Sequence, residues 1–357
     1  MVDRGSWVTD WQSSPRWWSA RRCGFVAVPL SNRVTWPREA GSDVDLDAVD
    51  TSLVRALQAD GRASFETLAG VVGLSRVATS NRVQRLLDSG AIRVAAVVHP
   101  AARGLSTLGH LAIDVSADAA KVAATIAAKP EMPLVSIVAG RHAVIAEVRT
   151  EDMGHLRATV TEVRELPEVH TVTTAVYTRG VKDVYAPGQG RAPAAAVPQP
   201  TELDPIDQGL VSLLQHDGRS SYAELGRAVS ISPSSARARV RALLDAGVVH
   251  IAAMIRPGML GLSSMCGFGL TLDTGPGITD RIAEHPEVYY LTETIGTWDA
   301  LGTVLCSSSE TVSVTLDQIR NIPGVVHLEA WMHLHVVRED YSLPALSGGD
   351  TEGEGTR

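Results

Sequence analysis

The chain contains the same segment twice, and this duplication constrains its fold more than any other feature. Residues 46–105 align with residues 203–262 at a constant offset of 157 without a gap, and 25 of the 60 aligned pairs are identical. The rest of each copy aligns at an offset of 156, which places Gly140 on Gly296. A repeat of this length indicates a duplicated module of roughly 140 residues, not a solenoid of short repeats. We therefore expect two related units in one chain.

Composition limits the class of protein. At 357 residues the chain is long enough for two or more domains, each with its own core. It has no run of about 18 apolar residues, so we expect no membrane span. Its cysteines, Cys23, Cys266 and Cys306, are scattered and odd in number, which argues against disulfides and a zinc site and favours the cytoplasm. The net charge of −8 argues against nucleic acid unless positive charge is concentrated on one element.

Each copy is expected to begin with three short helices. The first helix of each copy is expected to begin at an N-capping aspartate, Asp47 in the first copy and Asp204 in the second. A second aspartate lies three residues after each cap, at Asp50 and Asp207, as in a capping box. Asp-Gly pairs at 60–61 and 217–218 should end these helices. Serines should cap the second and third helices, namely Ser64, Ser75, Ser221 and Ser232.

Alternating strands and helices should come next. In the first copy we expect a strand at 106–116, a helix at 118–128, a hairpin at 134–150 broken at Gly140, a helix at 152–165 and a strand at 170–181. The second copy repeats this order over 263–338. A β-α-β-β-α-β order is typical of a ferredoxin-like unit. The predicted fold class is therefore α+β, with two copies of a helix-turn-helix followed by such a unit.

The second and third helices of each copy predict DNA binding. Two short helices joined by a tight turn form a helix-turn-helix, whose second helix enters the major groove. These third helices are locally basic, with three arginines and one aspartate over 76–88 and again over 233–245. Arginine pairs with guanine or phosphate, and Ser, Thr and Asn add hydrogen bonds. The alternative is an ordinary solvated helix face. The candidate DNA-binding residues, taken as exposed, are Ser75, Arg76, Thr79, Ser80, Asn81, Arg82, Arg85, Ser232, Ser234, Ser235, Arg237, Arg239 and Arg241.

These motifs resemble the Lrp/AsnC (feast/famine) family of transcriptional regulators. The resemblance rests on the LDxxD…LQxDGRxS block, on the SxxxxxxRV helix, on the LLDxG exit and on the β-α-β-β-α-β unit, and it covers about 44–185 and 203–341. It implies a winged helix-turn-helix joined to an amino-acid-sensing domain that dimerises through its sheet and assembles further. The implied partners are double-stranded DNA, an amino acid or related effector, and further copies of the chain, with no cofactor.

The expected domain order comes from the duplication. Residues 44–100 and 201–257 should be the helix-turn-helix domains, and 101–185 and 258–341 the sensing and dimerisation domains. Residues 186–200, rich in Pro, Ala and Gly, are expected to be a linker, and 342–357 a disordered tail. Residues 1–43 hold five of the seven tryptophans. We expect a disordered extension or a start assigned too far upstream; the alternative is an aromatic, basic tail that touches DNA or a partner.

A glycine turn in the sensing domain is the candidate effector site. In members of the family with one copy, the resemblance places the effector near a turn of the form Gly-x-aromatic-Asp. The second copy reads Gly296-Thr297-Trp298-Asp299, whereas the first has Gly140 but ends in Ala143 and lacks the carboxylate. An aspartate beside backbone amides can receive a ligand's ammonium group. The alternative is that Asp299 only caps a turn.

Enzymatic interpretations find less support in the residues. His327, His333 and His335 lie close together, but no cysteine or carboxylate completes a metal site at a matching spacing. No nucleophile elbow or phosphate-binding loop comes after a strand. We therefore expect no enzyme. The alternative is an enzyme like the sirohaem decarboxylases, which use this architecture to hold a tetrapyrrole and would need Arg and His converging in the sensing-domain cleft.

Overall fold

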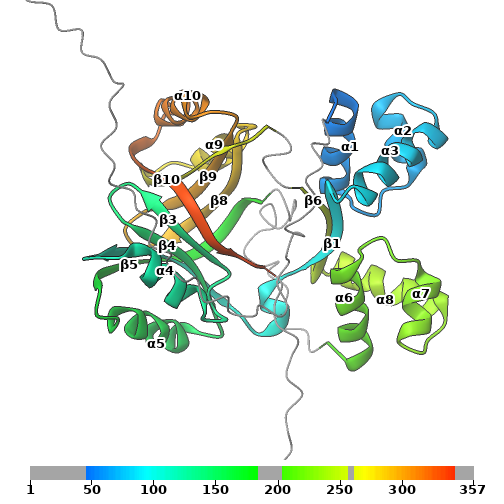
Figure 1. The fold of residues 1–357 in the computed structure, drawn as a ribbon, viewed down its shortest axis with the longest axis horizontal. Coiled ribbons are helices and arrows are strands. Elements are labelled where there is room, and N and C mark those ends of the chain that lie inside the picture. The colour runs from blue at the N-terminus through cyan, green and yellow to red at the C-terminus, as the bar shows by residue number, and fades with distance from the viewer. Residues whose placement is uncertain (1–45, 184–202, 256–260, 342–357) are drawn as a thin grey trace, which may run out of the picture. The chain divides into compact units, whose positions relative to one another are not determined.

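The computed structural model describes residues 46–183, 203–255 and 261–341 (Figure 1). The predicted N-terminal extension, linker and C-terminal tail lie outside the described residues. Within them, the predicted α+β fold class is confirmed, and the helices of the first copy and its strands at 107–115, 134–139 and 169–183 begin and end within two residues of their predicted bounds. The strand at 92–98 was not predicted, and the second strand of the predicted hairpin begins at residue 144, four residues after the break at Gly140.

Each copy begins with three helices, as predicted. They are α1 (Ala48–Ala59), α2 (Phe65–Val72) and α3 (Arg76–Asp88) in the first copy, and α6 (Pro205–His216), α7 (Tyr222–Ala228) and α8 (Pro233–Asp245) in the second. All of the predicted caps are present, because each Asp or Ser side chain accepts a hydrogen bond from the backbone N–H of the residue three positions further on. Asp60 and Asp217 are the C-cap residues of α1 and α6.

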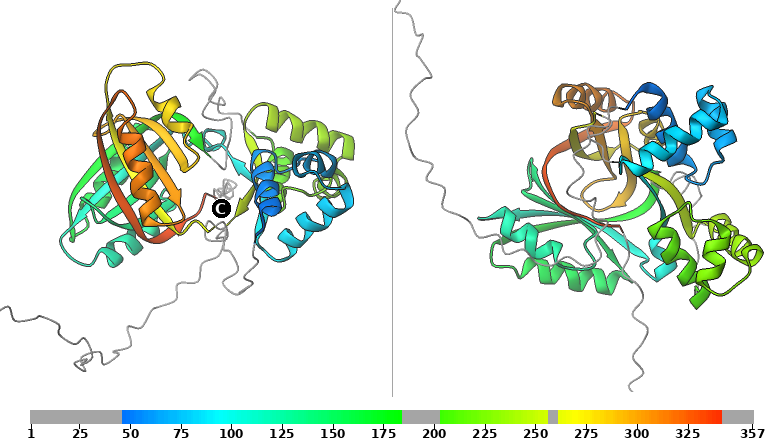
Figure 2. Two further views of the ribbon diagram at one scale, coloured as in Figure 1. Left: turned by 90° about the horizontal axis from the view of Figure 1, so that it is seen from above. Right: turned by 45° about the vertical axis from the view of Figure 1, so that its right-hand side comes forward.

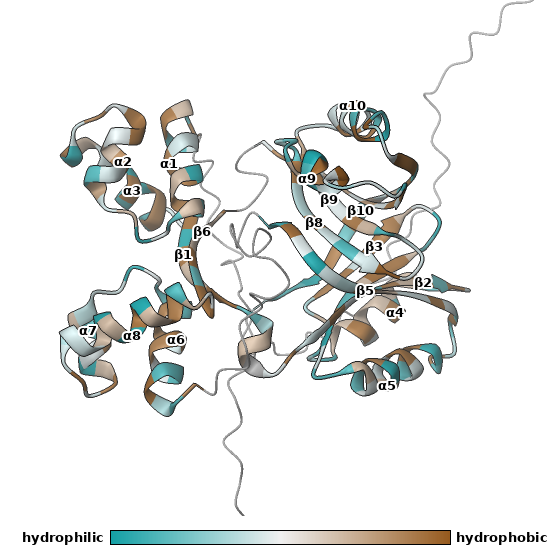
Figure 3. Ribbon diagram, turned by 180° about the vertical axis from the view of Figure 1, so that it is seen from behind, coloured by the Kyte–Doolittle hydropathy of each residue, from teal (hydrophilic) through white to brown (hydrophobic). Residues whose placement is uncertain are grey.

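The two helix-turn-helix units are joined by a pair of strands. β1 (Ile92–Val98) and β6 (Val249–Ile255) pair antiparallel over their full length. Helix α1 packs against β6 and α6 against β1, so each unit rests on the strand of the other copy. Apolar residues occur in both units and along β1 and β6 (brown in Figure 3), and the buried side chains form one continuous core, including Leu53, Leu57, Leu210 and Leu214. The two units therefore share a single hydrophobic core.

Glycine is required at two points where the backbones of the copies approach closely. The N–H of Gly61 donates to the carbonyl of Ile251 at 2.7 Å, and the N–H of Gly218 donates to the carbonyl of Val94 at 2.8 Å. A Cβ atom on Gly61 would lie 2.8 Å from the Ile251 carbonyl oxygen. The Asp-Gly pairs that end α1 and α6 therefore also contribute backbone hydrogen bonds between the copies.

The second half of each copy supplies four strands and two helices. After a short 3₁₀ turn (Pro100–Arg103), the first copy contains β2 (Thr107–Val115), α4 (Ala119–Ala127), β3 (Leu134–Ala139), β4 (Val144–Thr150), α5 (Met153–Arg164) and β5 (Val169–Asp183). The second contains β7 (Ser264–Leu272), α9 (Ile278–Ala283), β8 (Val288–Ile295), β9 (Ala300–Cys306), α10 (Ser309–Arg320) and β10 (Val325–Glu339).

The eight strands close into one barrel in the order β10-β3-β4-β2-β5-β8-β9-β7. Two of its seams join the copies: β5 pairs with β8, and β10 pairs with β3. Helices α4 and α5 lie on the outer face of the first copy's strands and α9 and α10 on that of the second (Figures 1 and 2). Two hydrophobic cores fill the space beneath these helices. The two β-α-β-β-α-β units thus pair within one chain.

Candidate DNA interface and effector site

Helix α3 exposes a mixed polar and apolar face. The side chains of Arg76, Asn81 and Arg85 are exposed, and that of Ser80 is half-buried. Thr79 is fully buried, so the prediction that it lies on the exposed face is wrong. It occupies the same stripe as the buried Val83, four residues on, which turns it toward the core.

Helix α8 exposes a more basic face. Ser234, Ser235, Arg237 and Arg241 are all exposed, as predicted. Neither Arg237 nor Arg241 forms an ion pair within 4.0 Å in the described part of the chain. Their guanidinium groups are therefore available for an external partner.

Two of the predicted DNA-binding arginines are engaged inside their own domains. Arg82 Nη1 donates to Asp47 Oδ2 at 2.6 Å and to Asp50 Oδ1 at 3.0 Å. The equivalent Arg239 Nη1 donates to Asp204 Oδ2 at 2.7 Å and to Asp207 Oδ1 at 2.9 Å. These hydrogen bonds to carboxylates raise the pKa of both guanidinium groups. Both arginines therefore tie the third helix of the unit to the N-terminus of the first.

Other predicted residues also have internal roles. Arg85 Nη2 donates to Asp50 Oδ2 at 2.5 Å, and the Asp50 carboxylate is buried. The hydroxyls of Ser75 and Ser232 accept the capping N–H groups of Ala78 and Ser235. Asp47 and Asp204 act as caps in the same way, and hydrogen bonds from backbone N–H groups, followed by those from Arg82 and Arg239, hold their pKa values below the ordinary range.

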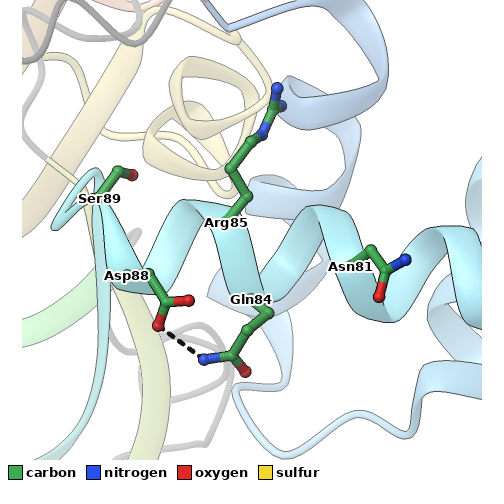
Figure 4. Close-up of a pocket in the computed structure, with 5 residues that line it drawn as sticks. All are labelled: Asn81, Gln84, Arg85, Asp88 and Ser89. Atoms are coloured by element: carbon green, nitrogen blue, oxygen red, sulfur yellow. Dashed lines mark hydrogen bonds between the residues drawn. The ribbon is translucent and has the colours of Figure 1, made fainter.

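Two exposed residues on α3 were not among the predicted DNA-binding residues. Val77, 69% exposed, projects an apolar side chain from the first turn. Gln84 lies two turns further on and lines a shallow concavity with Asn81, Arg85, Asp88 and Ser89 (Figure 4). Gln84 Nε2 donates to Asp88 Oδ1 at 2.7 Å, which fixes the direction of its amide. The spacing from Val77 to Asn81 to Gln84 is that of one helix face, and this could have identified both.

The predicted effector turn lies between β8 and β9. The Asp299 carboxylate accepts the Leu272 N–H through Oδ2 at 2.8 Å, so it does cap a neighbouring strand. Its side chain is nonetheless exposed. Gly296 has a φ of 150°, and a Cβ there would lie 2.7 Å from the Thr174 carbonyl oxygen on β5. The turn is therefore pressed against the last strand of the other copy.

The two turns differ in the residues after the glycine. Trp298 is buried and donates from Nε1 to Glu329 Oε2 at 3.1 Å. The equivalent residue of the first copy, His142, is also buried, and its Nδ1 lies 2.8 Å from Asp114 Oδ1. Near the first turn, a Cβ on Gly140 would lie 2.8 Å from the Cβ of Trp331 on β10. Both glycine turns thus contact the opposite copy, but only the second has an exposed carboxylate.

The inner side of the barrel holds histidines that the sequence reasoning did not bring together. The rings of His110 and His142 lie next to Trp298, and His110 also lies next to Trp331, with centroids between 5.6 and 6.3 Å apart. Burial and the neighbouring histidines lower the pKa of His110 to about 3, and burial lowers that of His333 to about 4. Among the described residues, His110 Nε2, His333 Nε2 and Trp331 Nε1 have no hydrogen-bond partner. No single strand carries this cluster, so no linear motif indicates it.

Other predicted features can be placed directly. His333 is half-buried on the barrel's inner side, whereas His327 and His335 are exposed, the latter at a bulge two residues after His333. The described residues contain no group of three or more His, Cys, Asp or Glu side chains that could hold a metal ion. Cys266 and Cys306 are buried free thiols. None of the described helices is long and apolar enough to cross a bilayer.

Comparisons with known proteins match this architecture. The AsnC-type helix-turn-helix domain matches residues 46–87 and 203–244, and the Lrp/AsnC ligand binding domain matches residues 111–187. The "HTH-type transcriptional regulator FL11" of Pyrococcus horikoshii is 29% identical over 145 residues, which cover 40% of this chain and 96% of that protein. The "Uncharacterized HTH-type transcriptional regulator PYRAB01370" of Pyrococcus abyssi is 30% identical over 146 residues, covering 40% and 92%.

A solved structure is similar over both copies. It is that of the sirohaem decarboxylase NirDL in complex with an iron-uroporphyrin III analogue. The TM-score is 0.57 with 13% sequence identity, and the match covers 82% of this chain and 95% of that one. At this identity the similarity concerns the fold alone.

Proposed function

Because this chain belongs to the Lrp/AsnC family of transcriptional regulators, we propose that it binds specific sites on double-stranded DNA through α3 and α8 and responds to a small effector. The observation that carries the proposal is the pair of exposed helix faces, each starting at a capping serine. A recognition helix reads base edges with such a face near its N-terminus.

The electrostatics support DNA binding in spite of the acidic net charge. Arg76 and Arg241 are exposed on α3 and α8, as is Arg237, one turn before Arg241. Arginines that reach phosphates release counterions, so affinity should fall steeply as salt is raised. Arg82 and Arg239 contribute mainly by holding the recognition helices in place, because their guanidinium groups already bind carboxylates.

The experiment is a gel-shift or anisotropy titration of the full chain against fragments selected from genomic DNA, at several salt concentrations. Replacing Arg237 and Arg241 with alanine should weaken binding, and the affinity of the unmodified chain should fall steeply as the salt concentration is raised. The matched control is Arg55→Ala, because Arg55 is exposed on α1 and belongs to neither recognition helix. Salt-independent binding, or unchanged binding in the double variant, would refute the proposal.

The effector is proposed to bind at the second glycine turn, near Asp299. The exposed carboxylate beside the Leu272 amide offers both a negative charge and a polar backbone, which suits the ammonium group of an amino acid. The first turn has Ala143 at the equivalent position and lacks that charge. We also propose that chains assemble into oligomers, as the family resemblance implies.

The second candidate is an enzyme similar to the sirohaem decarboxylases. Two observations favour it: the similarity of fold across both copies, and the cluster of His110, His142 and His333 inside the barrel. No arginine side chain joins that cluster among the contacts of the described residues; Arg149 instead pairs with Glu147 and lies over Tyr341. Titration with an iron tetrapyrrole, followed by its absorption spectrum, tests this candidate, and an unchanged spectrum would dismiss it.

A further inference from the structure

The two recognition helices present different chemistry at equivalent positions. One face of a helix is formed by positions i, i+3, i+4 and i+7. On α3 these are Val77, Ser80, Asn81 and Gln84, and on α8 they are Ser234, Arg237, Ala238 and Arg241. All four positions differ, whereas buried neighbours such as Val83 and Val240 are identical. The core of the module has been kept while the outer face has changed.

The face of α3 suits A·T base pairs. The amides of Asn and Gln form paired hydrogen bonds with adenine, and an apolar side chain packs against the thymine methyl group. Val77 is 69% exposed and Asn81 is exposed one turn later. The hydrogen bond from Gln84 to Asp88 uses one N–H of the Gln84 amide and leaves the other for a base (Figure 4). No arginine occupies any of these four positions.

The face of α8 suits G·C base pairs. A guanidinium group binds the O6 and N7 atoms of guanine with two hydrogen bonds. Arg237 and Arg241 lie one turn apart, and in the described part of the chain neither is held by an acidic side chain as Arg239 is. Ala238 between them is too small to obstruct their approach to the groove.

One chain contains both recognition helices, α3 with its A·T-type face and α8 with its G·C-type face, in units that are bonded to each other. The strands β1 and β6 join the two units, and their shared core is continuous. Arg62 donates from Nη1 to the Gly218 carbonyl at 2.7 Å, and Arg219 donates from Nη1 to the Gly61 carbonyl at 2.7 Å. Reciprocal bonds of this kind hold α3 and α8 as parts of one body, so like helices need not pair between chains.

We propose that the operator of this protein is not a palindrome but a composite site, with an A·T half-site bound by α3 and a G·C half-site bound by α8. The inference rests on the proposed DNA binding and adds the base class that each helix reads. In a symmetric dimer, identical helices impose two-fold symmetry on the site. Here the two unlike faces remove that requirement.

The test is selection of bound duplexes from a random library with the full chain, followed by sequencing. The expected result is one A·T-rich and one G·C-rich element at a constant spacing and relative orientation. Replacing one element with a copy of the other gives a site with two A·T or two G·C elements. Binding to such a site should be weaker by roughly five- to hundredfold for each mismatched base pair. A palindromic site selected by the unmodified chain would overturn the inference.

A face-exchange variant makes the test specific to the four positions. Ser234→Val, Arg237→Ser, Ala238→Asn and Arg241→Gln together give α8 the face of α3, and selection should then return two A·T elements. The matched control exchanges Arg55 and Ser212, equivalent and exposed residues of α1 and α6, and should leave the selected site unchanged. An unchanged site in the face-exchange variant would also overturn the inference. If no duplex is retained at any salt concentration, it is the proposed DNA binding that fails.

Discussion

Arg62 of the first copy donates a hydrogen bond from Nη2 to the backbone carbonyl of Ser220 in the second copy, at 2.9 Å. Its guanidinium group also lies 4.7 Å from the centre of the Tyr222 ring, and Arg219 mirrors this contact over Phe65 at 5.0 Å. Two arginines from the same motif in the two copies therefore clasp the helix-turn-helix units together. Each of these two arginines contacts the opposite copy. We call Arg62 and Arg219 together the arginine clasp, because they hold the two units as a pair.

Removing the arginine clasp should weaken the association of the two helix-turn-helix units. Arg62→Ala with Arg219→Ala leaves several carbonyl groups at the interface without a partner, at a cost of about 1–3 kcal/mol for each buried group. We expect a lower urea midpoint and weaker binding to a full operator, with binding to an isolated half-site changed much less. Arg55→Ala is the control and should shift stability by less than about 0.5 kcal/mol. Equal losses on full and half operators would contradict the role of the clasp.

Breaking the ion pairs beneath the recognition helices should affect the two copies unequally. Asp50 is 1% exposed and has two cationic partners, Arg82 and Arg85. Asp207 is 21% exposed, and among the described residues its cationic partner is Arg239 alone. Removing both arginines leaves the buried carboxylate of Asp50 without a positive partner. This lowers the free energy of unfolding more than the loss of the partner of a partly solvated carboxylate does. Arg82→Ala with Arg85→Ala should therefore lower the urea midpoint more than Arg239→Ala does. The single variant Arg85→Ala serves as the control, and the reverse ranking would count against the assignment.

Local signals in the sequence predicted the elements well because caps and turns are local chemistry. The Asp-x-x-Asp and Ser caps act over three residues, and each was found where the sequence placed it. The prediction that Thr79 is exposed is wrong because helix periodicity decides its environment: Thr79 lies four residues before the buried Val83, on the same face of α3. The roles of Arg82 and Arg239 depend on carboxylates 32 and 35 residues away, which helix periodicity does not reveal.

The pairing between copies could be anticipated only in outline. Duplication implied that two sensing domains could meet, but the seams depend on which strand edges remain unpaired after each domain folds. Those edges are β3 and β5 in one copy and β8 and β10 in the other. The histidine cluster results from that closure, since His110 and His333 come from different copies. A single copy considered alone contains neither the closed barrel nor the cluster.

The buried histidines should make the barrel sensitive to acid. The pKa of His110 is lowered to about 3, so between about pH 6.5 and 3 the unfolded chain binds a proton there that the folded chain does not. His110 therefore leaves the free energy of unfolding unchanged above about pH 6.5. Between about pH 6.5 and 3 it lowers the free energy of unfolding by up to about 1.4 kcal/mol for each pH unit of acidification. His110→Leu should flatten this dependence in urea unfolding between pH 7 and 5. The exposed His170 gives the control, His170→Leu; an equally steep profile in His110→Leu would contradict the prediction.

The effector response should depend on the charge of Asp299 more than on its shape. Asp299→Asn keeps an oxygen that can accept the Leu272 N–H, so the fold of the turn should be preserved while the negative charge is lost. A hydrogen bond to a charged group is worth about 1.5–3 kcal/mol, so an amino acid bound through its ammonium group should lose roughly ten- to hundredfold in affinity. Calorimetric titration with a panel of amino acids measures this, and the melting temperature without ligand reports on the turn.

Asp273→Asn, at another exposed aspartate near the end of β7, is the matched control. Because the first copy has Ala143 in place of the aspartate, its turn should contribute little, and full affinity in Asp299→Asn would exclude Asp299 from the effector site.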